Sequence, residues 1–197
     1  MRETEITIQI FEDLDYILEH IKKLGFEMVC EYKLNDFYFS ALDTSKKLDY
    51  STIIKNSFLV RQLLVRDEVS NMLVYKNKEI DETGAVVSEE KIRVQLSSLE
   101  NTLKIFEKAN INRWCELHQN MFEFKKGNIF FTVQNIDSLG NFIEYEEDET
   151  MKDMTNTEKR EFMHSQIAKL NLKMSDNISC KKVYMKYLQN LNNNKTI

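Results

Sequence analysis

The sequence contains no proline, and only four of its 197 residues are glycine. Turns must therefore rely on Asn, Asp and Ser, which are plentiful. The lack of proline and glycine argues against flexible linkers and several domains, and the length suits one domain with a full core. We expect a single domain over 1–191, followed by a frayed tail over 192–197.

Long apolar runs are absent too. None approaches the ~20 residues of a membrane span, and the charged N-terminus lacks a signal-peptide core. The three cysteines at positions 30, 115 and 180 are widely spaced, which fits reduced thiols and neither a disulfide framework nor a zinc site. These features predict a cytoplasmic protein that spans no membrane. A net charge of -5 argues against a nucleic-acid surface, although mixed charges leave room for a local basic site.

The segment ETEITIQI, residues 3–10, alternates in the manner of a strand with one buried face. Glu3 and Glu5 point to one side, and three isoleucines point to the other. Two glutamates on one strand face repel each other unless water, a cation or a basic partner lies opposite. The groups that face Glu3 and Glu5 should therefore reveal what this surface does.

The same order of elements occurs twice. The first strand is followed by a predicted helix over 12–24 and an extended segment over 26–40, either one long bent strand or two short ones. Later an alternating strand over 90–96 is followed by a predicted helix over 97–110 and an extended segment over 111–124. The chain therefore consists of two strand-helix-strand halves, each followed by a hairpin.

The first hairpin is FLVRQLLVR, DEVS and NMLVYKNK. A turn over 67–70 would place Arg61 opposite Lys76, and an anion would relieve the repulsion between them. The alternative is a slipped register with both side chains in solvent.

The second hairpin turns at Gly127, and the strand after it, over 141–147, places Glu144 and Glu146 on one face. A last amphipathic helix is predicted over 157–172, and the segment from 181 to 191 fits either a strand or a helix.

About eight alternating antiparallel strands with a few helices predict an α+β fold, an eight-stranded closed or nearly closed barrel with flanking helices. Glu, Lys and Arg would line its interior. Such an interior cannot be a dry core, because buried unpaired charges are costly. We therefore expect a wet, ligand-binding tunnel.

Several motifs resemble those of the CYTH superfamily, the triphosphate tunnel metalloenzymes. ETEIT resembles the N-terminal Glu-x-Glu-x-Lys signature, and LGFEMVCEYKLNDFYF resembles a segment ending in Asp-x-Tyr-Phe. LVYK resembles the stretch that ends in a tunnel lysine, DSLGNFIEYE resembles a Glu-x-Glu strand, and KVYMKYL resembles the closing segment. Their order and spacing are nearest to those of bacterial class IV adenylate cyclase-like proteins.

The resemblance implies a triphosphate in the tunnel, held by lysines and arginines, beside one or two Mg²⁺ or Mn²⁺ ions on carboxylates. Water attack would make a triphosphatase, and attack by a ribose 3′-hydroxyl would make a cyclase. The carboxylates that match the metal positions are Glu3, Glu5, Glu144 and Glu146. The cations assigned to the triphosphate are Arg61, Lys76, Lys91 and Arg93, with Arg66 as an alternative to Arg61.

The sequence also departs from the family pattern. Thr7 replaces the lysine of the first signature, and Gln134 stands where an inward aspartate is usual. Lys91 and Arg93 occupy a strand where the family places acidic residues, and residues 114–124 contain no Lys or Arg. No catalytic residue can be assigned, and we expect cyclase turnover to be weak or absent.

Three functions remain open at this stage. The chain is a cyclase-like protein that binds ATP or tripolyphosphate with a divalent metal, a residual triphosphatase, or a non-catalytic scaffold. In the last case Lys91 and Arg93 would pair with Glu3 and Glu5 and lock the tunnel with salt bridges. The expected partner is a small-molecule triphosphate or nucleotide, and a homodimer is left open.

Overall fold

The computed structural model describes residues 2–80 and 86–193. Its centre is one antiparallel sheet of nine strands in the order β1-β6-β5-β4-β3-β7-β8-β9-β2. The strands are β1 (Arg2–Glu3), β2 (Glu5–Ile10), β3 (Glu27–Ser40), β4 (Ser57–Val65), β5 (Glu68–Ile80), β6 (Val86–Gln95), β7 (Asn112–Lys126), β8 (Ile129–Ile136) and β9 (Gly140–Glu146). The helices are α1 (Leu14–Lys23), α2 (Tyr50–Lys55), α3 (Leu99–Lys108), α4 (Asn156–Ala168) and α5 (Lys182–Asn193), with a 3₁₀ turn at Glu149–Met151.

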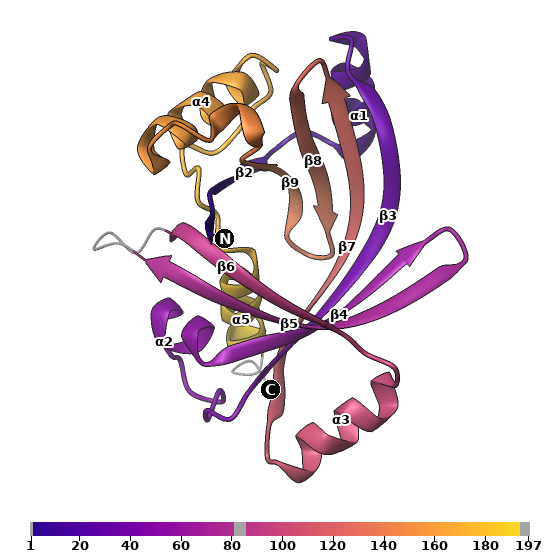
Figure 1. Cartoon of the computed structure of the whole chain (residues 1–197), viewed down its shortest axis with the longest axis vertical. Coiled ribbons are helices and arrows are strands. Elements are labelled where there is room, and N and C mark those ends of the chain that lie inside the picture. Colours follow the sequence, from indigo (N-terminus) through magenta and orange to yellow (C-terminus); the bar gives the residue numbers. More distant parts are fainter. Residues whose placement is uncertain (1, 81–85, 194–197) are drawn as a thin grey trace.

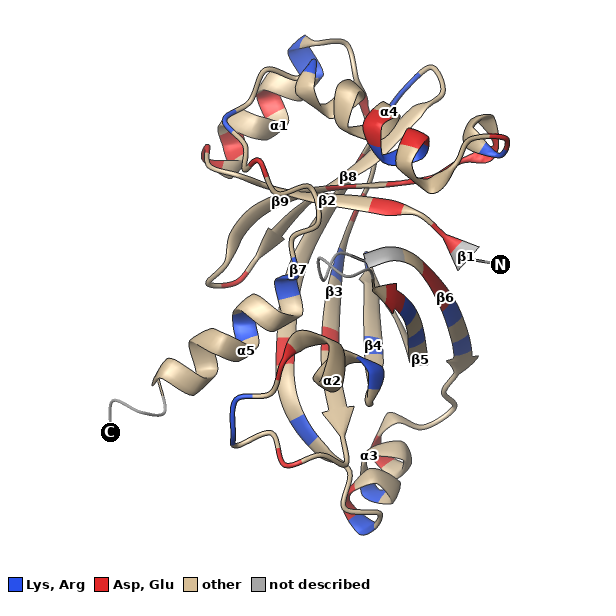
Figure 2. Cartoon of the chain, turned by 90° about the vertical axis from the view of Figure 1, so that its left-hand side faces the viewer, with Lys and Arg blue, Asp and Glu red and all other residues tan. Residues whose placement is uncertain are grey.

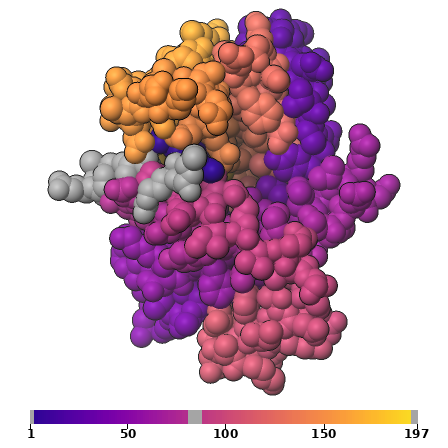
Figure 3. Space-filling view, viewed as in Figure 1, coloured from indigo at the N-terminus to yellow at the C-terminus, as the bar shows by residue number. Residues whose placement is uncertain are grey.

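The N-terminal segment joins the two edges of the sheet. Glu3 of β1 pairs with Glu89 of β6, and Glu5 of β2 pairs with Glu146 of β9. Between them, Thr4 leaves the ladder and its backbone N–H donates to the Glu147 carboxylate at 2.8 Å. The predicted antiparallel barrel-like sheet is confirmed, and the ninth strand arises because Thr4 interrupts the first one. In Figure 3 this indigo segment shows only as a small patch between the lobe that contains α4 and the lobe that contains β5 and β6.

The predicted repeat of strand, helix and strand is confirmed. One half is β2-α1-β3 with β4 and β5, and the other is β6-α3-β7 with β8 and β9. The two long strands β3 and β7 pair with each other at the centre of the sheet (Figure 1). The first strand of each half pairs with the last strand of the other, so neither half completes its sheet alone.

Helices cover the outer face of the sheet at both ends. The isoleucines of β2 are buried against α1 and α4, as their alternation with polar residues predicted. Figure 2 shows these two helices on the side of β2, β8 and β9 away from β4, β5 and β6. At the other end, Phe106 of α3 covers Phe39 of β3 and Val60 of β4.

The inner face is filled at one end by α2 and α5. Ile53 of α2 and Tyr187 of α5 are buried with inward residues such as Leu59 and Val74. The hydroxyl of Tyr187 donates to the backbone carbonyl of Lys46 at 2.5 Å, which holds the loop before α2. The segment 181–191 is therefore mainly helical, and its helix packs against the inner face of the curled sheet.

Two predictions about local structure need correction. The β4–β5 loop contains only Arg66 and Asp67, and Arg66 has a φ of 53°. Because a two-residue loop fixes the register, Arg61 lies opposite Met72 and not opposite Lys76. The predicted turn over 67–70 was wrong. Arg66, the alternative to Arg61, lies in this exposed turn.

The predicted tail over 192–197 begins inside α5, which extends to Asn193, and residues 194–197 lie outside the described residues. Among the helices that the structure describes, none combines the length and apolar character required to cross a bilayer.

Candidate metal and anion site

A cavity of about 280 Å³ lies on the inner face of the curled sheet, next to the start of α5. It contains the four cations that the sequence assigned to a triphosphate and three of the four predicted metal carboxylates, all but Glu3. The charged side chains that line it are Glu5, Asp36, Arg61, Lys76, Lys78, Lys91, Arg93, Glu123, Glu144, Glu146, Lys181 and Lys182.

Strand alternation places these groups together. Lys76 and Lys78 are inward positions of β5, and Lys91 and Arg93 are inward positions of β6. Glu89 precedes Lys91 by two residues and belongs to the same face, where it contacts both Lys78 and Lys91. Glu89 was not among the predicted site residues, although the alternation of β6, extended backwards by two residues from Lys91, places it on the same face. The inward face of β6 is therefore not wholly basic.

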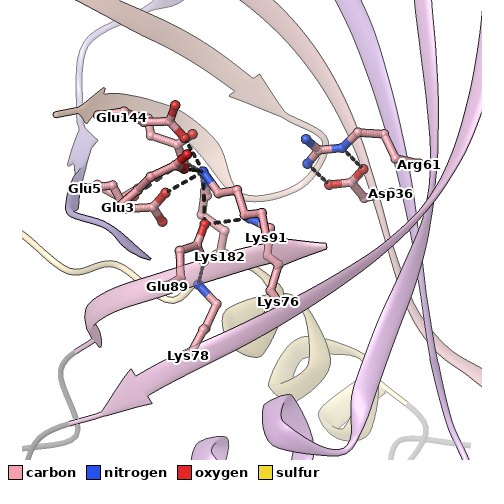
Figure 4. A network of polar contacts seen from close by, with 12 residues as sticks. Glu3, Glu5, Asp36, Arg61, Lys76, Lys78, Glu89, Lys91, Glu144 and Lys182 are labelled. Carbon is pink, nitrogen blue, oxygen red and sulfur yellow. Dashed lines mark hydrogen bonds and ion pairs between the residues drawn. The ribbon is translucent and has the colours of Figure 1, made fainter. Parts of the chain in front are cut away.

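Lys91 sits within four carboxylates (Figure 4). Its Nζ lies 2.6 Å from an oxygen of Glu146, 3.0 Å from Glu3, 3.1 Å from Glu89 and 3.7 Å from Glu5. Only 6% of its side chain is exposed. Burial opposes the charge, but the carboxylates raise the pKa of Lys91 above its usual value. The cation that faces Glu3 and Glu5 in this structure is thus Lys91, which is one of the two alternatives that the sequence left open.

Glu89 is a carboxylate that contacts three lysines of β5 and β6. Its side chain is fully buried and lies 2.6 Å from Nζ of Lys78 and 3.4 Å from Nζ of Lys76. Lys76 and Lys91 are direct partners on neighbouring strands, so Glu89 relieves their repulsion. Burial acts against its ionisation, yet the three lysines hold the pKa of Glu89 well below the usual range. Glu89 therefore carries its negative charge in the folded state.

Glu144 has its own partner, Lys182, which was not among the predicted site residues either. Lys182 is the first residue of α5, and its Nζ donates to Glu144 and, at 2.6 Å, to Gln134. Burial opposes ionisation, but Lys182 and then Lys76 lower the pKa of Glu144 to about 2. No strand pattern marks Lys182, because it reaches the cavity from a separate helix.

Arg61 and Arg93, the two arginines of the cavity, differ in whether an acidic partner already binds them. Arg61 makes two bonds to buried Asp36, Nε to Oδ1 at 2.7 Å and Nη2 to Oδ2 at 2.6 Å. Its guanidinium is already engaged, and Gln119 approaches the same carboxylate at 3.4 Å. Arg93 is exposed at the cavity wall and forms no ion pair within residues 2–80 and 86–193.

Three carboxylates converge in the cavity. Glu5, Glu144 and Glu146 each offer an oxygen, and these oxygens lie within 4.8 Å of one another. Burial and the neighbouring charges of Glu144 and Glu89 raise the pKa of Glu5. Glu3, which the sequence grouped with them, contacts Lys91 outside this triad. Clustered carboxylate oxygens are the ligands that Mg²⁺ and Mn²⁺ prefer.

These charges predict acid sensitivity. Because the folded pKa of Glu144 is about 2, its contribution to stability is present above pH 4.5 and is lost as the pH falls towards 2. Glu89 acts in the same direction, and protonation of Glu5 offsets part of the loss. We expect the free energy of unfolding in urea to decline from pH 5 to pH 3, with a smaller decline in Glu144→Gln. Equal stability at both pH values would contradict this.

Comparisons with known proteins agree with this architecture. No family model matches the sequence. A protein of Methanocaldococcus jannaschii, named "Putative adenylate cyclase MJ0240", is 28% identical over 148 residues, which are 74% of this chain and 77% of that protein.

Two solved structures are similar in fold. The PH1819 protein from Pyrococcus horikoshii OT3 has a TM-score of 0.70 at 16% identity, with 95% of this chain and 98% of that chain covered. A structure from Vibrio parahaemolyticus, titled a "putative adenylate cyclase", has a TM-score of 0.62 at 16% identity and covers 93% and 97% of the two chains. The predicted resemblance to adenylate cyclase-like proteins is confirmed: the chain is similar to proteins named "putative adenylate cyclase".

Proposed function

We propose that the protein binds a triphosphate compound together with a divalent metal in the cavity of the curled sheet. The proposal rests on one observation: cationic side chains and a cluster of carboxylates line the same cavity. Lysines of β5, β6 and α5 face the converging carboxylates Glu5, Glu144 and Glu146. The lysines suit the oxygens of a polyphosphate, and the carboxylates suit the divalent metal that accompanies it.

The three converging carboxylates fit Mg²⁺ or Mn²⁺ by their chemistry, since all are hard oxygen donors. Glu5, Glu144 and Glu146 would hold the ion, which would polarise a phosphoryl group. Burial and the charges of Glu144 and Glu89 raise the pKa of Glu5, and a bound metal would stabilise its ionised form. The lysines and Arg93 would bind phosphoryl oxygens and orient the chain of phosphates.

The cavity size favours the phosphate chain over a complete nucleotide. A volume of about 280 Å³ is at the lower limit of ligand pockets. The three phosphates can lie inside the cavity while a nucleoside attached to them stays at its opening. Arg61 is committed to Asp36 and Thr7 replaces a lysine, so the phosphate contacts are fewer than the family pattern has. We therefore expect weak cyclase turnover and give triphosphate hydrolysis as the alternative activity.

Calorimetry tests this proposal. We expect tripolyphosphate to bind the purified protein at least tenfold more tightly with Mn²⁺ than without it, since metal and lysines then share the charge of the ligand. Two assays follow, ATP conversion to cyclic nucleotide and pyrophosphate, and phosphate release from tripolyphosphate. A protein that binds tripolyphosphate in neither condition would exclude the ligand-binding proposal.

The second candidate is a scaffold without a ligand. It is favoured by the pairing of Lys91, Lys182 and Arg61 with carboxylates of the cavity itself. Glu146→Gln separates the two candidates. In a metal site this change weakens Mn²⁺-dependent binding, whereas in a locked scaffold it lowers only the free energy of unfolding.

A further inference from the structure

The geometry points to Lys91 as an internal cation that occupies the carboxylate cluster and must leave it when a divalent metal binds. We propose that this exchange couples the two ligands of the cavity: metal binding frees the Lys91 ammonium, which then becomes available to the polyphosphate. The inference rests on the proposed function for its second step, but the competition between Lys91 and metal stands without it.

The contacts of Lys91 carry the first step. Two of its four carboxylate partners, Glu5 and Glu146, are members of the converging triad. Its Nζ is 2.6 Å from Glu146, a full charge-assisted hydrogen bond, so an ion bound by that oxygen competes for the same lone pairs. An ammonium and a divalent cation also repel strongly at such short range. Metal and Lys91 therefore compete for this oxygen of Glu146.

The surroundings of Lys91 carry the second step. Lys76 lies directly opposite on β5, and Arg93 follows on the same strand face, both at the cavity wall. An ammonium released from Glu146 therefore joins two cations that already face the cavity. Glu89, 3.1 Å from Nζ and behind the cluster, keeps a negative charge within reach of Lys91. The side chain can thus leave the triad without losing every carboxylate partner.

The consequence is positive coupling. Without metal, Lys91 neutralises carboxylates and offers nothing to an anion. With metal, the same carboxylates are neutralised by the ion, and Lys91 adds to the anion site. Linkage requires the reverse effect as well, so a bound polyphosphate that holds Lys91 must strengthen metal binding by the same factor.

Calorimetric titration with Mn²⁺ alone tests the competition. We expect Lys91→Met to bind Mn²⁺ at least tenfold more tightly than the unaltered protein, because its carboxylates have lost their internal cation. Lys91→Arg keeps the charge and should stay within about threefold of the unaltered protein. Lys104→Met, on the exposed face of α3, is the matched control and should change nothing. Equal or weaker Mn²⁺ binding by Lys91→Met would overturn the proposal.

A second measurement uses the unaltered protein, in case Lys91→Met does not fold. Lys91 is almost fully shielded, so acetic anhydride should modify it slowly. Mn²⁺ is added without tripolyphosphate, so that only the exchange between metal and Lys91 is tested. We expect Mn²⁺ to raise the acetylation of Lys91, read by peptide mass spectrometry, and to leave Lys104 unchanged. No rise at saturating Mn²⁺ would overturn the exchange. Failure to bind tripolyphosphate, with the rise still present, would reject only the proposed function.

Discussion

Glu89→Gln is expected to lower the free energy of unfolding by about 3 to 5 kcal/mol, the range for removing one member of a buried ion pair. The side chain is fully buried and lies between the ammonium groups of Lys76, Lys78 and Lys91. Lys91 keeps other carboxylates when Glu89 is lost, but Lys78 forms no second ion pair within residues 2–80 and 86–193. Lys78 is only 9% exposed, so water compensates poorly for the lost charge.

Glu90→Gln is the matched control, because it makes the same chemical change one residue further along β6. Glu90 belongs to the other face of the strand and bonds Asn77 at 3.3 Å. We expect it to change the free energy of unfolding by less than about 1 kcal/mol, as is usual for partly exposed groups. Urea unfolding at pH 7 measures both variants. A loss for Glu89→Gln no larger than that of Glu90→Gln would show that the three lysines do not depend on Glu89.

The fold was largely predictable because its signals are periodic. Alternation in 3–10 and 90–96 identified β2 and β6, and the repeated order of elements identified the two halves. Turn geometry was not predictable in the same way. Nothing in the sequence indicates that Arg66 adopts a positive φ, so the two-residue loop and the register of Arg61 were missed. The partner of Arg61 shifted by four residues, from Lys76 to Met72, and an even shift leaves the same residues pointing inward.

The site was predictable where strands supply it and not where a helix does. The assigned cations and all predicted carboxylates except Glu3 line the cavity, because inward positions of neighbouring strands meet there. Lys182 comes from α5, whose place against the sheet depends on packing of Val183 and Tyr187. The role of Lys91 was open for another reason. A sequence shows that opposite charges share a face, but only distances show which carboxylates one ammonium selects.

Glu144→Gln should change tripolyphosphate binding in opposite directions with and without metal. In the presence of Mn²⁺, we expect binding to weaken by about tenfold to a hundredfold, the loss that follows from one charge-assisted contact of about 1.5 to 3 kcal/mol. In metal-free buffer with a chelator, we expect binding to strengthen by about tenfold. The variant removes a negative charge from the cavity and leaves Lys182, the partner of Glu144, available to the anion.

Glu123→Gln separates the metal effect from the effect of charge. Glu123 also lines the cavity but lies outside the converging triad, so its change removes the same charge without removing a metal ligand. We expect this control to strengthen metal-free binding and to keep the gain that Mn²⁺ brings. Calorimetric titrations of both variants and of the unaltered protein in both buffers give the six affinities needed. If Glu144→Gln keeps the full gain from Mn²⁺, the metal is not held by Glu144, and the carboxylates of the cavity serve only to pair its lysines.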